Sequence, residues 1–522
     1  MVVVTYRPIS TSHPLCQMQI NPTNAARPAQ LSVRVGSEIC IEESKIPPMM
    51  RQRIESRLTR VNPDKQQRER LGLPSYDIPD RVSLVKSVRT PLGSELCVPR
   101  GALDIVRFAA DKSNVELCFS SVAVTNGVGP RSLDDLPVDL RDYQKEAIKT
   151  LIQRVQGYVT LPCGGGKTVL GAGAVYASGE SALILVHTHE LMDQWEATFR
   201  NLYGVKVRRA GAPWSALKPG EVAIATVQKL HRVGWNARRL YSSAGVVLLD
   251  ECHHAPASTF RELLSAIPAR YRWGLTATPE RPDGWGFLLP MVMGPQVYRM
   301  TTSDLVDRGF LVEPMILPVR TGTSVAAADN RTGRINMSRA VTQLSEDRKR
   351  YELIMELAMI AAQHGRRVLV LVPRVKLAHT IANDLRIERI NAAAITGSVD
   401  KGYRGKLMRG FREGGLQVAI ATQLADEGLD VPMLDMLIIA SAGRAAGRAI
   451  QRIGRAMRPS PGKARPVVVD LIDNGPFRSQ WRAREKAYLR ELKVDVPAPI
   501  RAEDAPALLT RILGGDMALK KV

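Results

Sequence analysis

The stretch LPCGGGKTVL, Leu161–Leu170, places three consecutive glycines directly before a lysine and a threonine. Glycines allow backbone N–H groups to approach and surround a phosphate, as a nucleotide-binding loop requires. The strict pattern also has a glycine six residues before the lysine, and here that position is Leu161. A flexible glycine-rich turn is the alternative interpretation, so the flanking sequence has to decide.

The flanks predict a strand before the loop and a helix after it. The apolar run YVTLP precedes the glycines, and TVLGAGAVYASG follows them. From Leu140 onward, amphipathic helices alternate with further apolar runs, which are SALILVH, VAIATV, VVLLDE and RWGLTAT. A second series of the same kind begins near Arg366 with RRVLVLVP, NAAAIT, QVAIAT, MLIIAS and PVVVDLI. Continuous apolar strands separated by helices are typical of parallel sheets covered on both faces, so we predict two α/β domains.

A pair of carboxylates follows one of these strands, in VVLLDECHH, Val246–His254. The carboxyl edge of a parallel sheet is where α/β proteins bind ligands, so Asp250 is a candidate Mg²⁺ ligand and Glu251 a candidate base for an attacking water. A metal cluster of Cys252, His253 and His254 is the alternative. Consecutive strand residues alternate faces, so these three would surround a zinc ion poorly.

These features together resemble the superfamily 2 helicases, whose loop usually lacks the first glycine. The segments similar to that family's motifs are, in order, LRDYQKEAI, LPCGGGKT, VHTHELMDQW, ATVQKL, DECHH, GLTATP, VLVLVPRVKLA, ATQLADEGLDVP and QRIGRAMRP. They cover the chain from Leu140 to Asp473. The stretch after GLTATP and the C-terminal part resemble XPB-like and phage UvsW-like DNA helicases. The resemblance implies two tandem RecA-like domains with parallel sheets, preceded by a small α+β accessory domain.

The resemblance also implies a site for ATP and Mg²⁺. The implied catalytic residues are Lys167, Glu251, Arg455 and Arg458. The implied ATP-binding residues are Arg141, Gln144, Gly164, Gly165, Gly166, Lys167, Thr168, Asp430 and Gln451. Thr168 and Asp250 are the implied Mg²⁺ ligands.

The arginines of the last motif can be examined by helical geometry. At roughly 100° per residue, a helix here would gather five polar side chains within an arc of about 120°. These are Arg448, Gln451, Arg452, Arg455 and Arg458. A solvated basic face is the alternative interpretation. The match to the family motif favours arginine fingers that reach across a domain interface.

Further roles follow from the resemblance alone. The residues that match positions contacting the nucleic-acid backbone are His189, Gln194, Thr226, Gln228 and Thr422. His253, Thr276 and Thr278 are candidates for relaying nucleotide-driven changes, or could equally be core or turn residues. Trp195 has the helical spacing of a core residue as well as the chemistry of a base-stacking platform.

The expected domain division follows the motifs. Residues 1–135 form the accessory domain, a DNA grip or a structural module, and residues 136–300 form the ATP-binding domain. Residues 301–345 are expected to be a linker, residues 346–475 the second RecA-like domain, and residues 476–522 a helical extension.

Composition supports a polyanionic partner. Lys and Arg number 73 against 51 Asp and Glu, which gives a net charge of +22. Neutralising phosphates releases counterions, so a protein this basic is typically a nucleic-acid binder. The six cysteines form no CxxC pair, and neither a signal peptide nor a membrane span is found, so we expect a cytoplasmic protein. The sequence predicts an ATP-dependent DNA helicase or translocase on duplex, forked or branched DNA in repair, recombination or replication. An RNA-dependent ATPase and the motor subunit of a restriction-type system are the alternatives.

Overall fold

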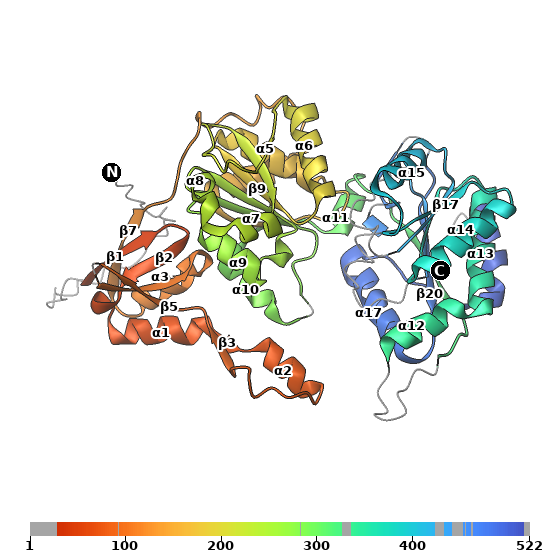
Figure 1. The fold of residues 1–522 in the computed structure, drawn as a ribbon, viewed down its shortest axis with the longest axis horizontal. Coiled ribbons are helices and arrows are strands. Elements are labelled where there is room, and N and C mark those ends of the chain that lie inside the picture. The colour runs from red at the N-terminus through yellow and green to blue at the C-terminus, as the bar shows by residue number, and fades with distance from the viewer. Residues whose placement is uncertain are drawn as a thin grey trace, which may run out of the picture.

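The computed structural model describes residues 29–91, 93–281, 283–325, 336–422, 433–440, 453–454, 456–460 and 463–515. In Figure 1 an N-terminal domain lies beside a first α/β domain, which is followed by a second α/β domain. No helix in the described part of the chain is long and apolar enough to cross a membrane.

The first α/β domain is built on a seven-stranded sheet in which all paired strands are parallel. The strands, in sheet order, are β10 (Arg208–Arg209), β11 (Val222–Thr226), β9 (Ala182–Val186), β12 (Val246–Asp250), β13 (Tyr271–Thr276), β8 (Gln156–Thr160) and β14 (Gln296–Arg299). Every residue of β9, β11 and β12 is buried, as expected for a sheet covered on both faces.

Alternate residues of these strands pack into two different hydrophobic layers. Ile184 and Leu248 pack with α4 (Asp142–Arg154), α5 (Lys167–Ser178) and α6 (His189–Tyr203). Their neighbours Leu183 and Leu249 pack with the opposite layer. That layer contains α7 (Val227–Val233), α8 (Arg238–Tyr241), α9 (Ser258–Ser265) and α10 (Leu288–Met293). The period of two along each strand therefore divides the helices between the faces.

The second α/β domain has a sheet of the same size, again with only parallel pairing. Its strands, in sheet order, are β17 (Ala392–Ile395), β18 (Val418–Ala421), β16 (Val368–Leu371), β19 (Met436–Ile439), β20 (Val467–Ile472), β15 (Met315–Arg320) and β21 (Ile500–Arg501). The surrounding helices are α12 (Met337–Glu346), α13 (Arg348–Gln363), α14 (Val375–Ile387), α15 (Lys401–Glu413), α17 (Arg478–Ala487) and α18 (Ala505–Leu513). The predicted fold class is confirmed.

Two segments differ from the expected division of the chain. The sequence predicts a linker over residues 301–345, but this segment contains α11 (Thr302–Asp307), β15 and α12. β15 pairs with β20 over its whole length. Residues 316–319 of β15 are apolar and buried, so this strand is part of the second sheet and not of a linker. The sequence predicts a helical extension over residues 476–522, but this segment also supplies β21, which pairs with β15 at Val319 and Arg320.

The N-terminal domain has a mixed five-stranded sheet. Its strands, in sheet order, are β5 (Lys86–Thr90), β6 (Gly93–Pro99), β2 (Glu38–Glu42), β1 (Ala29–Val35) and β7 (Val115–Ser121). Helices α1 (Pro48–Leu58) and α3 (Leu103–Asp111) contribute to the same hydrophobic core. Leu288 of α10 is buried in that core as well, so the N-terminal domain is packed firmly on the first α/β domain.

Two buried arginines hold this junction from either side. The guanidinium of Arg100 donates to the carbonyls of Ala269 and Arg270 at 2.5 Å. In the other direction, Arg272 of β13 donates to the carbonyl of Ser37 at 2.9 Å. Burial lowers the pKa of Arg272 to about 9 and that of Arg100 to about 10. These carbonyls satisfy the terminal guanidinium donors, although the buried Arg272 Nε has no hydrogen-bond partner among the described residues. Removing either arginine would leave buried carbonyls unpaired.

Candidate active site

The glycine loop forms a cradle at the carboxyl end of β8. Gly164 and Gly166 have φ values of +86° and +74°, in the left-handed region that favours glycine. A Cβ atom at Gly166 would lie 2.5 Å from Gln144 Nε2, and one at Gly164 would lie 2.8 Å from Leu311 Cδ2. Side chains at these positions would therefore collide with the walls of the loop. The geometry is that of an anion cradle at a helix N-terminus, because α5 begins at the next residue.

Lys167 is the first residue of α5 and turns back over the loop. Its Nζ lies 3.4 Å from the carbonyl oxygen of Leu161 and 4.0 Å from Glu251 Oε1. Burial alone would lower the pKa of Lys167, but the nearby Cys163, Glu251 and Asp250 outweigh burial and raise it. Lys167 is therefore a permanently charged group inside the cradle.

The two predicted carboxylates stand at the end of β12, facing this lysine. The Trp195 indole donates from Nε1 to Asp250 Oδ2 at 2.7 Å, and the Glu251 backbone N–H donates to Asp250 Oδ1 at 2.9 Å. Burial and the neighbouring Glu251 raise the pKa of Asp250, while the Trp195 hydrogen bond and Lys167 oppose that rise. The two hydrogen bonds fix the orientation of the Asp250 carboxylate.

Glu251 has the ionisation state and the unoccupied hydrogen-bond acceptor that a base requires. Its backbone adopts a left-handed conformation with φ +49°, which is uncommon for a residue with a side chain. Burial would raise the pKa of Glu251, but Lys167 and His253 lower it to about 2. Its Oε2 is buried and accepts no hydrogen bond from any described residue, although His253 Nδ1 lies 3.4 Å away. An ionised acceptor without a hydrogen bond can receive a proton from a water.

The three predicted relay residues meet directly behind Glu251. His253 Nδ1 lies 3.1 Å from Thr276 Oγ1, and Thr276 Oγ1 donates to the carbonyl of Thr278 at 3.1 Å. The Thr278 backbone N–H returns a hydrogen bond to Thr276 Oγ1 at 3.3 Å. The end of β13 is thereby connected to the segment that follows Asp250.

The alternative metal cluster at DECHH finds no support. Among the described residues, one group of three potential metal ligands has its ligand atoms within 4.8 Å of one another. This group is Cys40, Glu95 and Cys97 in the N-terminal sheet, not the residues of DECHH. Cys252 is buried and packs in the hydrophobic layer beneath β12. His253 points instead to Thr276.

The segment upstream of α4 closes the cradle from the other side. The Gln144 side chain caps α4 through the Arg141 backbone N–H at 3.1 Å, and its Nε2 lies 3.4 Å from the Gly166 carbonyl. Tyr143 OH donates to the Gly165 carbonyl at 2.9 Å. The Arg141 guanidinium lies 4.4 Å from the centre of the Phe310 ring. Gln144 thus contacts the loop directly, while Arg141 lies beside it on the Tyr143 and Phe310 side chains.

The last motif reaches the loop from the second domain. A Cβ atom at Gly454 would lie 2.8 Å from Cys163 Cβ, and one at Gly164 would lie 3.3 Å from Arg458 Cγ. The Val312 backbone N–H donates to the Met457 carbonyl at 2.7 Å, so the last motif also contacts the segment whose Leu311 lies against Gly164. Arg458 therefore lies beside the cradle. The other predicted residues of this side, Arg455, Gln451 and Asp430, lie outside the described residues.

Thr168, the predicted Mg²⁺ ligand on the loop, is contacted by a predicted nucleic-acid residue. Gln194 Nε2 donates to Thr168 Oγ1 at 3.2 Å, although Gln194 is otherwise exposed on α6. The side chain of Gln194 is therefore directed toward the ATP loop in this structure.

The other predicted nucleic-acid residues lie at the carboxyl ends of strands. His189 is exposed at the start of α6, after β9. Thr226 ends β11 and is buried, and Gln228 is exposed in the first turn of α7. Thr422 follows β18, and its hydroxyl is buried with no hydrogen-bond partner among the described residues. Both sheets therefore present these residues at the same type of edge.

Three contacts of the site could not be read from sequence. Trp195 is a fully buried core residue, as its spacing suggested, and yet its indole N–H holds Asp250. Tyr143 and Phe310 form an edge-to-face pair at 5.3 Å between ring centres, beside Arg141. Phe310 lies far from α4 in sequence and belongs to no motif quoted above, so only the folded chain places it there.

Comparisons with known proteins agree with the two-domain site. A family model described as "Type III restriction enzyme, res subunit" matches residues 137–281, and "Helicase conserved C-terminal domain" matches residues 349–460. The chain is 24% identical to the DNA 3'-5' translocase XPB2 of Sulfurisphaera tokodaii, over 68% of this chain and 88% of that protein. It is 25% identical to the DNA 3'-5' helicase XPB of Mycobacterium tuberculosis, over 69% of this chain and 66% of that protein.

A solved structure of yeast Dbp5 bound to RNA and ADP BeF3 is similar in fold, with a TM-score of 0.53 and 14% identity. The match covers 72% of this chain and 93% of Dbp5. The chain spans just over half the length of two haloarchaeal relatives, at 56% and 53%. Two regions of the chain match family models of helicases and restriction-enzyme motors, and the chain resembles XPB-like superfamily 2 helicases.

Proposed function

We propose that this superfamily 2 helicase couples ATP hydrolysis to movement along DNA, and that it acts on duplex, forked or branched DNA. One observation carries the proposal. The ionised Glu251, which accepts no hydrogen bond at Oε2 from the described residues, faces Lys167 on the glycine loop, and the last motif of the second domain contacts the same loop at Cys163. A hydrolytic site closed by two domains is what a translocating motor requires.

Each side chain has a distinct role in the proposed reaction. Lys167 binds the β- and γ-phosphates of ATP, since it is the charged group inside the cradle. Glu251 orients the attacking water and takes its proton at Oε2. Arg458, together with Arg455, stabilises negative charge on the transferred phosphoryl group from the second domain.

The loop also fits a divalent cation. Thr168 Oγ1 and the Asp250 carboxylate are hard oxygen donors of the kind that Mg²⁺ prefers. When bound, Mg²⁺ neutralises phosphate charge. Trp195 holds the Asp250 carboxylate in one orientation for this purpose, through the 2.7 Å hydrogen bond.

The same contacts provide a route from chemistry to movement. The loop touches the second domain at Gly454 and Arg458, so loss of the γ-phosphate removes a bridge between the domains. The pairing of His253 with Thr276 then passes the change to the end of β13, at the carboxyl edge of the first sheet. Alternate closing and opening would move the two domains along the DNA backbone.

DNA as the substrate is supported by charge and by relatives. The net charge of +22 favours a polyanion. The archaeal and mycobacterial relatives are named as a DNA 3'-5' translocase and a DNA 3'-5' helicase. We further propose that the N-terminal domain grips DNA, since its fixed attachment through Arg100 and Arg272 would let it move as one body with the first domain.

The test is the steady-state ATPase rate without nucleic acid and with single-stranded DNA, blunt duplex, forked duplex or RNA. Glu251→Gln serves as the inactive variant, and Glu262→Gln, on the exposed face of α9, is the matched control. We expect strong stimulation by duplex or forked DNA and none by RNA. Stimulation by RNA alone would overturn the choice of substrate, and no stimulation by any nucleic acid would overturn the motor function.

A further inference from the structure

A narrow arm projects from the N-terminal domain. It comprises residues 59–83, with β3 (Thr59–Val61), α2 (Pro63–Arg70) and β4 (Arg81–Ser83). β3 and β4 pair antiparallel at its base, between the buried Leu58 and Leu84. Figure 1 shows the arm leaving the N-terminal sheet past α1 and running below α10 in the direction of the second domain.

The arm presents apolar and basic side chains to solvent. Tyr76 is 92% exposed, and Leu73 is 44% exposed near it in sequence. Arg60, Arg70 and Arg81 are also exposed, and none of the three forms an ion pair with a described residue. Exposed aromatic and aliphatic side chains on a segment that buries little of its own surface indicate an interaction site. Arg70 is near Tyr76 in sequence, whereas Arg60 and Arg81 lie in the paired strands at the base of the arm. Exposed guanidinium groups and an exposed aromatic ring on one arm suit a nucleic acid, whose bases stack and whose phosphates pair with guanidinium groups.

The base of the arm is fastened to the segment that follows the Thr276–Thr278 motif. The Trp285 indole donates from Nε1 to Asp64 Oδ1 of α2 at 2.9 Å. A Cβ atom at Gly284 would lie 2.9 Å from Pro63 Cβ, so the Gly284 backbone approaches the Pro63 ring closely. Trp285 also packs on the N-terminal core and stacks on Phe287.

From Trp285, polar contacts continue to the ATP site. The Trp285 backbone N–H donates to Asp283 Oδ1 at 3.1 Å, and Asp283 pairs with the Arg281 guanidinium. Arg281 NH1 donates to the His253 carbonyl at 2.7 Å. His253 in turn faces Glu251. The arm is thus joined to the proposed base by a continuous series of contacts that uses no residue of the second domain.

We propose that the arm is a second nucleic-acid contact, which binds unpaired bases beside a duplex, and that the Asp64–Trp285 hydrogen bond couples its occupancy to ATP hydrolysis. This rests on the proposed function. Tyr76 stacks on an exposed base at the junction, and Arg60, Arg70 and Arg81 contact the flanking phosphates. Occupancy of the arm fixes Asp64, Trp285 and Arg281 in place, and with them the carbonyl of His253.

The first experiment measures binding and ATPase stimulation of the full chain with a forked DNA and with its blunt duplex. Tyr76→Ala is compared with wild type and with Ile387→Ala, a 76% exposed aliphatic residue at the end of α14. We expect Tyr76→Ala to weaken fork binding at least fivefold and to reduce stimulation by the fork to the level given by the duplex. The Ile387→Ala variant should match wild type.

The second experiment separates binding from coupling. Trp285→Phe keeps an aromatic ring in the N-terminal core but lacks the indole donor to Asp64. We expect this variant to bind the fork as wild type does. The amount by which the fork stimulates its ATPase beyond the duplex should fall at least threefold. Asp64→Ala, which removes the acceptor from the arm side, should reproduce the loss even where Trp285→Phe disturbs packing. Thermal melting of each variant verifies that the domain stays folded.

The outcomes discriminate between the two proposals. If no nucleic acid stimulates the wild type, the motor function fails and the arm's role fails with it. If the wild type responds but Tyr76→Ala leaves its fork binding and fork stimulation unchanged, the motor stands and the arm is not a nucleic-acid contact; a protein then becomes its expected partner. Unchanged stimulation in both Trp285→Phe and Asp64→Ala would overturn the coupling alone.

Discussion

The two α/β domains have the same sheet topology but different side chains at the carboxyl edges of their sheets. In sheet order, the strands of the first domain are β10, β11, β9, β12, β13, β8 and β14, and the second domain repeats this order with β17, β18, β16, β19, β20, β15 and β21. The register of pairing aligns the two domains residue by residue, since Val246 and Met436 each pair with the first residue of the neighbouring strand, Ala182 and Val368. By this register Ala440 occupies the position of Asp250.

Each domain also has a basic residue in the first turn of a helix after its equivalent strand, directly after β8 in the first domain and after β15 and α12 in the second. In the first domain it is Lys167 of α5, which lies 4.0 Å from Glu251. In the second it is Arg350 of α13, which donates to Asp473 Oδ1 at 3.0 Å and to the Ala440 carbonyl at 2.6 Å. Arg350 is 1% exposed and Asp473 is 4% exposed.

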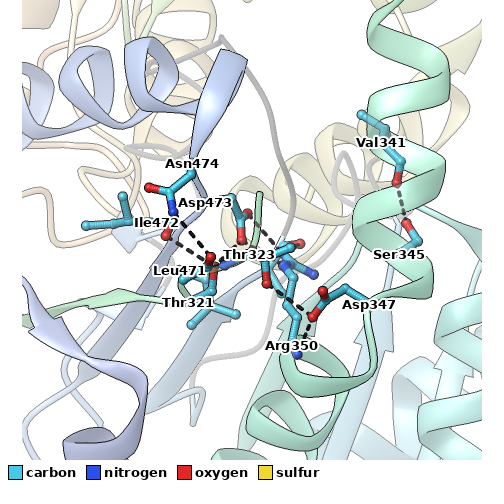
Figure 2. Close-up of polar contacts among 12 residues, drawn as sticks. Thr321, Thr323, Val341, Ser345, Asp347, Arg350, Leu471, Ile472, Asp473 and Asn474 are labelled. Carbon is cyan, nitrogen blue, oxygen red and sulfur yellow. Dashed lines mark hydrogen bonds and ion pairs between the residues drawn. The ribbon is translucent and has the colours of Figure 1, made fainter. Parts of the chain in front are cut away.

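Figure 2 shows how the second domain completes this pair from its own side chains. Thr321 Oγ1 donates to Asp473 Oδ1 at 2.7 Å, and Thr323 Oγ1 donates to Asp347 Oδ1 at 3.1 Å. Asp347 caps α13 through the Arg350 backbone N–H at 2.8 Å. The edge proposed to bind phosphate in the first domain corresponds to an edge filled by the Arg350–Asp473 ion pair in the second. On our proposal, a shared scaffold therefore has one edge that binds a ligand and one that is filled by its own side chains.

The largest expected effect is on the ligand-binding edge. Glu251→Gln keeps the size and hydrogen-bonding capacity of the side chain but cannot accept the proton of the attacking water. We expect the ATPase rate to fall by about 10²–10⁴-fold, the usual contribution of a positioned general base. Equilibrium binding of a fluorescent ATP analogue should be little changed. A variant that retains a tenth or more of the wild-type rate would remove Glu251 from this role.

The next effect is on the second edge, and it concerns stability. Arg350→Met leaves the Asp473 carboxylate buried without its cation, which costs about 3–5 kcal/mol of unfolding free energy. The double variant Arg350→Met/Asp473→Leu should recover most of that loss. Urea denaturation, with hydrogen exchange to locate the weakened strands, provides the measurement.

The matched change in the first domain should behave differently. Lys167→Met removes a basic residue that is 4.0 Å from its acid and 3.4 Å from its carbonyl partner, so these are weak contacts. We expect the unfolding free energy to fall by less than in Arg350→Met, because the Lys167 contacts are longer than those of Arg350. Equal losses from Arg350→Met and Lys167→Met would refute the contrast between the two edges.

The sequence predicted much of this fold and less of its interior connections. Both sheets could be expected because apolar runs such as residues 182–186 and 467–472 leave few alternatives to a buried parallel strand. The linker predicted over the segment containing β15 was wrong, because a single apolar run isolated from its neighbours by polar sequence carries no information about which sheet it joins. The glycine loop and the acid pair could be located by their motifs, and their meeting followed from the rule that ligands bind at the carboxyl edge.

Contacts between distant segments were beyond such reasoning. The hydrogen bond of Trp195 to Asp250 depends on how α6 crosses the sheet, and the pairing of Arg350 with Asp473 joins residues from α13 and the end of β20. Neither pair has a spacing rule, since each depends on tertiary packing of elements that are not adjacent in the chain. The arm contact between Asp64 and Trp285 is of the same kind.

A smaller effect, on the Mg²⁺ requirement, is expected from Trp195, the core residue that contacts Asp250. Trp195→Phe retains a ring in the hydrophobic layer but removes the donor to Asp250 Oδ2. A hydrogen bond to a charged group contributes about 1.5–3 kcal/mol, so the Mg²⁺ concentration for half-maximal ATPase activity should rise by about tenfold or more. Trp273→Phe is the control, because the Trp273 indole donates to the Leu151 carbonyl, away from the carboxylates. A similar Mg²⁺ requirement in both variants would mean that Trp195 only fills the core.

The smallest effect concerns pH and again belongs to the first domain. Burial, reinforced by His253 and His187, lowers the pKa of His254 to about 3, below its ordinary value of 6.5. Between these two values the unfolded chain binds a proton at this site and the folded chain does not, so the folded state loses stability as the pH falls below 6.5. His254→Asn should remove this loss and make the variant relatively more stable than wild type at about pH 5.5 than at about pH 7.5, by about 1 kcal/mol. Urea denaturation at the two pH values measures the difference, with His364→Asn, an exposed histidine after α13, as the control. An unchanged pH dependence in His254→Asn would mean that the imidazole is accessible to protons in the folded state, and that the layer behind Glu251 is less tightly packed than the filled edge around Arg350.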